Sequence, residues 1–129
     1  LCLADLMLDT FWYNAHTSAS DALWAGVPLV TQLGQGFPAR VAASVLQAAR
    51  LPQLVSRGPE EYVELAVRLA SRPAELAAIK EHLSTQRLRL PLFDTGRFVR
   101  HLESAIEIAW CRHVEGQSPE HFAVPETPC

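Results

Sequence analysis

Short apolar runs alternate with longer helical patterns along the first half of the chain. Three of these runs have the length and composition of buried strands, and they cover residues 6–8, 27–31 and 54–56. Helical patterns over residues 17–25 and 38–50 separate them, and Gly26 follows the first pattern, where a helix C-terminus favours a left-handed residue. This alternation predicts an α/β fold in which helices cover a parallel sheet.

The second half of the chain is predicted to be helical. Apolar residues at helical spacing follow Pro59 and Pro73, and a long last helix begins after Asp94 or Thr95. One face of each helix is expected to be core; in the last helix this stripe comprises Phe98, Leu102, Ala105, Ile106, Ala109 and Trp110. We expect one domain over residues 1–115, incomplete at its N-terminus, and a proline-containing tail over residues 116–129.

Composition narrows the class of protein. A net charge of −3 argues against a nucleic-acid binder, which usually presents a basic domain or stripe. The three cysteines share no metal-ligand spacing, so a reduced, cytoplasmic setting is their simplest account. No apolar run approaches the roughly 18 residues that a membrane span needs.

Small polar residues open the first predicted helix, directly after the first strand. A helix N-terminus leaves up to four backbone N–H groups unpaired and carries a partial charge of roughly +0.5, so it attracts anions. Thr17 and Ser18 add hydroxyl groups there, and the ring of His16 could pack on a base or sugar or donate to a phosphate. Asp21 lies one helical turn after Thr17, where its carboxylate could accept both hydroxyls of a ribose. The arrangement suits a nucleoside diphosphate.

A purely structural interpretation of the same residues is also open. Thr17 or Ser18 can serve only as the N-cap, and Asp21 only as a complement to the helix dipole. Position favours binding, because ligands of open α/β sheets lie outside the carboxyl ends of the strands. The loop 32–37 lies at the same edge, and its Gly34-x-Gly36 pattern, although it lacks the rest of a dinucleotide fingerprint, permits close backbone approach.

Four segments of the chain, taken in order, resemble a known family. They are residues 8–31 with the runs Leu8-Asp9-Thr10 and Asn14 to Thr31, residues 40–44, residues 61–62 with the helix that follows, and residues 91–110. Together they resemble the C-terminal catalytic lobe of the protein O-linked N-acetylglucosamine (O-GlcNAc) transferases over roughly residues 3–121. The resemblance implies a GT-B architecture of two Rossmann-like lobes, of which this chain is part of the second, ending in a long helix.

The resemblance also implies roles for the polar turn. His16, Thr17 and Ser18 would hold the diphosphate of UDP-N-acetylglucosamine together with the helix amides, and Asp21 would hold the ribose. Ser18 replaces a Thr of the family and keeps the hydroxyl, whereas Ala15 stands where a Gly often precedes the His. The implied reaction transfers N-acetylglucosamine to Ser or Thr hydroxyls of a protein or peptide with inversion, and needs no metal or other cofactor.

The family's remaining catalytic groups lie upstream of Leu1, so the catalytic residues are unknown and the chain alone is expected to be inactive. The implied partners are the UDP-sugar donor, the protein acceptor, the missing N-terminal lobe and tetratricopeptide repeats, with neither nucleic acid nor membrane among them. Two other functions stay open. One is a different GT-B enzyme that uses a UDP-sugar, either an N-linking protein glucosyltransferase or a UDP-sugar epimerase. The other is a non-catalytic scaffold lobe.

Overall fold

The computed structural model describes residues 3–125, which form two compact units. The first unit ends at Phe93 and the second begins at Asp94, and each is described by itself. The expected division into residues 1–115 and 116–129 stays a prediction. No helix in residues 3–125 combines the length and the apolar character needed to cross a membrane.

A three-stranded parallel sheet organises the first unit. Its strands are β1 (Met7–Leu8), β2 (Leu29–Gln32) and β3 (Val55–Ser56), in the spatial order β1-β2-β3. Met7 pairs with Leu29, and Thr31 pairs with Val55. The parallel α/β sheet expected for part of a GT-B lobe is therefore confirmed, although each strand is shorter than its apolar run.

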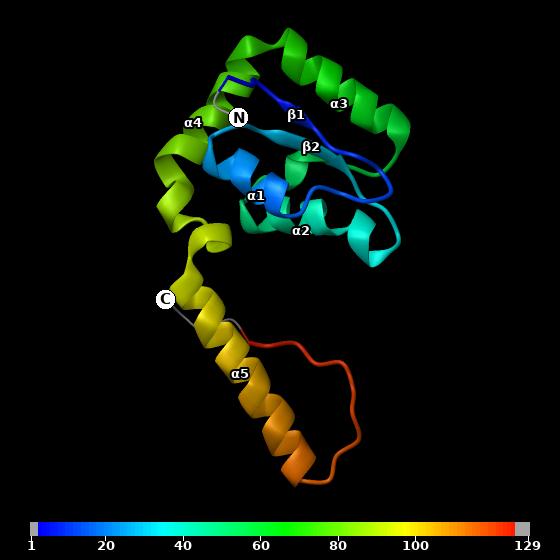
Figure 1. Cartoon of the computed structure of the whole chain (residues 1–129), viewed down its shortest axis with the longest axis vertical. Helices are drawn as coiled ribbons and strands as arrows, with labels where there is room; N and C mark the ends of the chain where they lie inside the picture. Colours follow the sequence, from blue (N-terminus) through cyan, green and yellow to red (C-terminus); the bar gives the residue numbers. More distant parts are fainter. Residues whose placement is uncertain (1–2, 126–129) are drawn as a thin grey trace. The chain divides into compact units, whose positions relative to one another are not determined.

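Helices cover both faces of this sheet. Helices α1 (Thr17–Trp24) and α2 (Val41–Ala48) lie on one face and α3 (Pro59–Ser71) on the other, and α4 (Pro73–Gln86) packs against α3 (Figure 1). Short 3₁₀ turns join them at Phe37–Ala39 (η1), Pro52–Leu54 (η2), Arg87–Arg89 (η3) and Pro91–Phe93 (η4). The helix expected to start at Pro38 begins as the turn η1, and α2 itself starts at Val41.

The core lies between the sheet and its helices. Leu29 and Val30 of β2 are fully buried, and leucines of four helices belong to the same hydrophobic cluster. These leucines are Leu23 of α1, Leu46 of α2, Leu69 of α3 and Leu83 of α4. The inner faces predicted for the helices after Pro59 and Pro73 are confirmed, since Tyr62, Leu65, Leu69, Ile79 and Leu83 are all buried.

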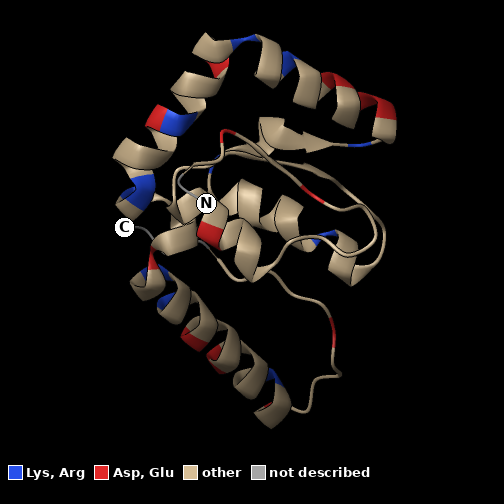
Figure 2. Ribbon diagram, turned by 45° about the horizontal axis from the view of Figure 1, so that its top comes forward, with Lys and Arg blue, Asp and Glu red and all other residues tan. Residues whose placement is uncertain are grey.

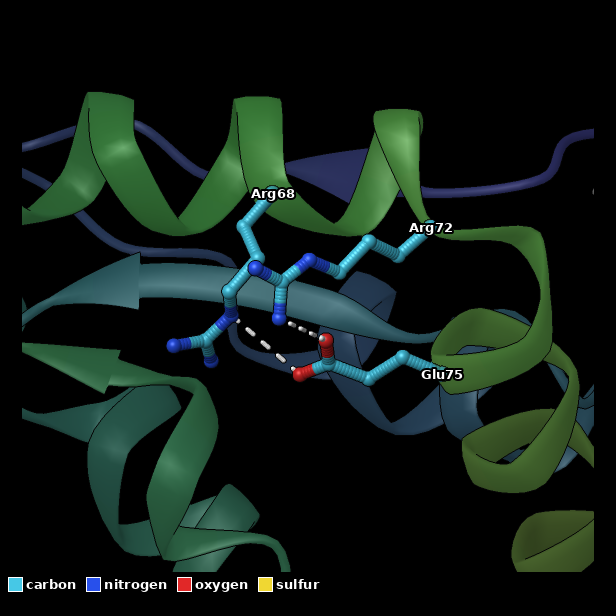
Figure 3. A network of polar contacts seen from close by, with 3 residues as sticks. All are labelled: Arg68, Arg72 and Glu75. Atoms are coloured by element: carbon cyan, nitrogen blue, oxygen red, sulfur yellow. Dashed lines mark ion pairs between the residues drawn. The ribbon is translucent and has the colours of Figure 1, made fainter.

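Polar contacts join α3 to α4 and the turn η3 to the end of α1. Glu75 of α4 pairs with Arg68 (Nε–Oε1, 3.2 Å) and lies 3.8 Å from Arg72 across the α3–α4 corner (Figure 3). Arg87 of η3 donates to the carbonyl of Trp24 and lies 4.8 Å from the centre of its indole ring. Exposed ion pairs contribute little each, so these contacts orient the elements more than they stabilise them.

The second unit consists of α5 (Thr95–Val114) and the segment that follows it. The carboxylate of Asp94 caps α5 by accepting from the N–H of Arg97 at 2.9 Å. No residue of α5 is buried, and Phe98 and Trp110 are 63% and 65% exposed. The expectation that its apolar stripe is core is therefore wrong for the described residues, because the second unit supplies nothing that covers the stripe.

Charges of both signs are interspersed along α3, α4 and α5 (Figure 2), as expected of solvated helix faces. Cys111 is exposed and free, and the other two cysteines lie outside the described residues. Residues 117–125 form no helix or strand.

Three helices end in the same hydrogen-bonded turn. At α1, the N–H of Gly26 donates to Leu23 and that of Val27 donates to Ala22, which is the Schellman motif. The motif recurs after α2 and α5. Its left-handed residue is Gly26 (φ +79°) or Gly116 (φ +71°) in two cases, but Arg50 (φ +58°) after α2.

We expect Arg50→Gly to raise the free energy of unfolding by up to about 1 kcal/mol, because glycine adopts positive φ without steric cost. Gly26→Ala is the matched control. A Cβ at Gly26 would meet no atom within 4 Å, so the loss of about 1 kcal/mol expected there is purely conformational. Urea unfolding measures both, and a destabilised Arg50→Gly variant would contradict the argument.

Candidate functional site

A buried carboxylate at the end of β1 holds the turn that leads into α1. Asp9 is 7% exposed, and its Oδ1 accepts from the backbone N–H groups of Thr10 at 2.9 Å and Ala15 at 2.7 Å. Its Oδ2 accepts from the hydroxyl of Thr31 on β2 at 2.6 Å. Such a carboxylate is tolerated when hydrogen bonds replace its lost hydration. Both ends of the loop after β1 are therefore fixed to the sheet.

Two further side chains brace the same loop. Asn14 is 1% exposed; its Nδ2 donates to the carbonyl of Thr10 at 2.7 Å, and its N–H donates to Pro38 at 2.9 Å. The hydroxyl of Tyr62 donates to the carbonyl of Asp9 at 2.9 Å. Burial and, secondly, the charge of Asp9 raise the pKa of Tyr62, so its phenol stays protonated and donating at neutral pH.

His16 occupies the N-cap position of α1, and aromatic rings hold its side chain. Its ring stacks on Tyr13, with centroids 4.8 Å apart and planes at 18°, and the ring of Phe37 lies edge-on at 6.3 Å. Its Nε2 lies 3.4 Å from the carbonyl oxygen of Pro38. The imidazole is half-buried, and these contacts restrict its orientation.

Thr17 and Ser18 are the first two residues of α1, and both are exposed. Neither is the N-cap, and no side chain caps this helix. The N–H groups of Ala19 and Ser20 donate to the carbonyl of His16 at 3.1 and 3.3 Å, whereas those of Thr17 and Ser18 find no acceptor within residues 3–125. The interpretation of Thr17 or Ser18 as the N-cap is therefore wrong, and the N–H groups of these two residues remain open.

Asp21 lies one turn further along α1 and is exposed. The first turn of α1 contains no acidic residue, so Asp21 is placed beyond the range where a charge complements the helix dipole well. It forms no ion pair with any part of the chain that the structure describes. His16, Thr17, Ser18 and Asp21 thus share the start of one helix, and their binding role stays a prediction.

The glycine loop after β2 has a structural reason. A Cβ at Gly34 would lie 2.5 Å from the Cβ of Ala39, and the N–H of Gly34 donates to the Ala39 carbonyl at 2.8 Å. The absence of a side chain at Gly34 thus allows the turn η1 to pack closely against the loop, and the group that approaches the Gly34 backbone is Ala39. Beside it, a surface depression of about 840 Å³ lies along α2 and the carboxyl ends of β2 and β3. None of the four predicted residues lines it, although Phe37 does.

Asp9, Phe37 and Tyr62 are residues of the site region to which the sequence assigned no role. Asp9 carried a signal, because a carboxylate directly after a buried strand needs donors nearby. Tyr62 was predicted as core, and its hydroxyl contact spans 53 positions, which periodicity does not reveal. Within residues 3–125, no group of three or more His, Cys, Asp or Glu residues is placed to hold a metal ion.

Comparison with known proteins gives consistent results. The model of "Glycosyl transferase family 41" matches residues 2–102. The chain is 43% identical over 125 residues to a probable UDP-N-acetylglucosamine–peptide N-acetylglucosaminyltransferase (SEC) of Arabidopsis thaliana, covering 96% of this chain and 13% of that protein. It is 36% identical over 120 residues to the Caenorhabditis elegans UDP-N-acetylglucosamine–peptide N-acetylglucosaminyltransferase, covering 93% and 10%.

Among solved structures, the K341M mutant of the Thermobaculum terrenum O-GlcNAc transferase superposes with a TM-score of 0.77 at 39% identity. The match covers 82% of this chain and 20% of that one. The chain therefore spans only a small part of the length of the proteins that it matches.

Because neither hydroxyl caps α1, we expect Thr17→Ala and Ser18→Ala each to change the free energy of unfolding by less than about 0.5 kcal/mol. An N-cap would lose about 1 kcal/mol. Ser56→Ala is the control, since its buried hydroxyl donates to the Thr31 carbonyl at 3.1 Å and its removal should cost about 1 kcal/mol. Urea unfolding of the three variants checks this, and losses at residues 17 and 18 equal to that at Ser56 would contradict it.

Proposed function

Because the chain belongs to glycosyl transferase family 41, we propose that it is the nucleotide-sugar-binding part of a protein O-GlcNAc transferase. The proposed donor is UDP-N-acetylglucosamine, and the proposed acceptor is a Ser or Thr hydroxyl of a protein or peptide. The printed names of the relatives, UDP-N-acetylglucosamine–peptide N-acetylglucosaminyltransferases, support both assignments.

The observation that carries the proposal is the open N-terminus of α1. The N–H groups of Thr17 and Ser18 have no acceptor among the described residues, and both side chains are exposed beside them. Two backbone donors, two hydroxyls and the positive end of the helix dipole form a seat for the diphosphate of UDP. The N-terminus of α1 has neither a side-chain cap nor an acidic residue in its first turn, so no negative group of the helix neutralises its partial positive charge.

Asp21 and His16 extend this seat on either side. Asp21, one turn into α1, is assigned to the two ribose hydroxyls, because a carboxylate accepts from both. His16 is assigned to the nucleotide side of the seat. Tyr13 and Phe37 hold its ring, so little rotational freedom is lost when a ligand packs against it.

The proposed reaction is an inverting displacement at the anomeric carbon. The acceptor oxygen forms a bond to the anomeric carbon. At the same time the bond between this carbon and the β-phosphate oxygen breaks, and UDP departs with the electron pair. The hydroxyl proton passes to a base that we place outside this chain. Negative charge grows on the departing UDP, and donors already oriented at the start of α1 stabilise it without reorganisation. The proposal assigns no metal to this step.

The rest of the enzyme is part of the proposal as well. Because the chain spans 13% of the Arabidopsis relative, we place the partner lobe, the base and the acceptor site in a longer protein, with tetratricopeptide repeats before them. We also propose a cytoplasmic location.

Calorimetric titration tests the nucleotide seat. We expect the full chain to bind UDP, and Asp21→Ala to weaken this binding about tenfold, equivalent to about 1.4 kcal/mol. Glu64→Ala, at an exposed acidic residue of α3, is the matched control and should bind as the unchanged chain does. Equal affinity in the Asp21 and Glu64 variants, or no heat from a chain shown to be folded, would count against the seat.

The chain alone is expected to transfer no sugar, because the base and the acceptor site are assigned to other parts of the enzyme. The assay follows radiolabelled N-acetylglucosamine from its UDP donor onto a Ser- or Thr-containing peptide, with the Thermobaculum terrenum O-GlcNAc transferase as positive control. Labelled peptide above the enzyme-free blank would show that residues of this chain complete the reaction.

A further inference from the structure

The proposed function assigns no role to the buried carboxylate of Asp9, which bonds to the loop just before the nucleotide seat. Asp9 is 7% exposed, and no Lys, Arg or His within residues 3–125 pairs with it. Isolated buried carboxylates are costly, and the position would be apolar if burial alone decided it. The three neutral donors around Asp9 therefore indicate a specific task for the carboxylate.

The three donors come from two segments, the loop that leads into α1 and the neighbouring strand β2. Oδ1 accepts from Thr10 and from Ala15, which are the two ends of the loop between β1 and His16. Oδ2 accepts from Thr31, which belongs to the neighbouring strand β2. One side chain thus closes the loop upon itself and fastens it to the sheet.

The hydrogen bond between Asp9 and Ala15 lies close to the open N–H groups in the sequence. Ala15 is followed at once by the N-cap His16 and then by Thr17 and Ser18, so the 2.7 Å bond from Ala15 to Asp9 lies two residues before the N–H group of Thr17. Donors that bind a diphosphate must be held to within about 0.5 Å. Helix α1 offers no cap of its own to do this.

We propose that Asp9 is a positioning residue: it clamps the Thr10–Ala15 loop so that the N–H groups at the start of α1 are preset for the nucleotide diphosphate. This inference rests on the proposed function. Its carboxylate oxygens accept from Thr10, Ala15 and Thr31, so Asp9 acts through the loop and not by contact with the nucleotide.

The conservative replacement has a distinctive outcome under this proposal. An Asn at residue 9 keeps one oxygen to accept from Thr10 and Ala15, and its amide can donate to the Thr31 hydroxyl instead. The clamp survives while the negative charge disappears. Asp9→Asn should therefore keep the affinity for UDP, whereas Asp9→Ala removes both the acceptor and the clamp.

The experiment titrates the full chain and its variants with UDP at a temperature where circular dichroism shows each to be folded. We expect at least tenfold weaker binding by Asp9→Ala and binding within about threefold of the unchanged chain by Asp9→Asn. Leu69→Ala, a core truncation in α3, is the control that lowers the unfolding midpoint without changing affinity. If Asp9→Ala does not fold, Asp9→Ser replaces it, because its shorter side chain cannot reach all three donors.

Unchanged affinity in Asp9→Ala, or equal losses in Asp9→Asn and Asp9→Ala, would overturn the proposal. Amide hydrogen exchange and ¹⁵N–¹H spectra without nucleotide separate this inference from the proposed function. We expect Ala15 to exchange at least tenfold faster in Asp9→Ala, with shifted Thr17 and Ser18 resonances, and Asp9→Asn to restore both. If no variant binds UDP, the proposed function fails, and spectra of Asp9→Ala that match the unchanged chain would overturn the positioning role too.

Discussion

Buried polar groups need hydrogen-bond partners inside the protein, and this requirement determines the structure at the carboxyl ends of the three strands. Asp9 follows β1, Thr31 lies on β2 and Ser56 on β3, and all three are buried. The Thr31 hydroxyl donates to Asp9, and the Ser56 hydroxyl donates to the Thr31 carbonyl. A row of hydrogen bonds therefore crosses the sheet where its apolar pairing ends. The loop into α1 has its shape because it supplies the remaining donors to this row.

Local signals explain why much of the fold was predictable. Helices α3 and α4 begin at Pro59 and Pro73, because a proline has no N–H group to lose in a first helical turn. Gly26 ends α1 in the left-handed conformation expected of it. Arg50 plays the same part after α2 and gave no such signal, since the conformation there is imposed by hydrogen bonds and burial around it rather than preferred by the residue.

What the sequence could not predict depends on contacts between distant segments. The polar residues at the start of α1 stood out locally, whereas the clamp at Asp9 links positions that are 22 residues apart at Thr31. Helix α5 shows the complementary limit. Its apolar spacing predicted a helix with one hydrophobic face, and that helix is present, but periodicity says nothing about which surface covers the face. The fold class and the starts of α3 and α4 thus follow from short-range chemistry, whereas the partners of each helix face do not.

The contact between Arg87 and Trp24 has an electrostatic consequence for α1 as a whole. A helix is a dipole with two ends, and Arg87 brings a full positive charge to a carbonyl at the negative end from 63 positions away. The positive end has no acidic side chain in its first turn. A side-chain charge therefore compensates the negative, C-terminal end of the dipole, whereas no side-chain charge in the first turn compensates the positive, N-terminal end. The N-terminal end of α1 therefore presents a positive potential to any anion before that anion binds.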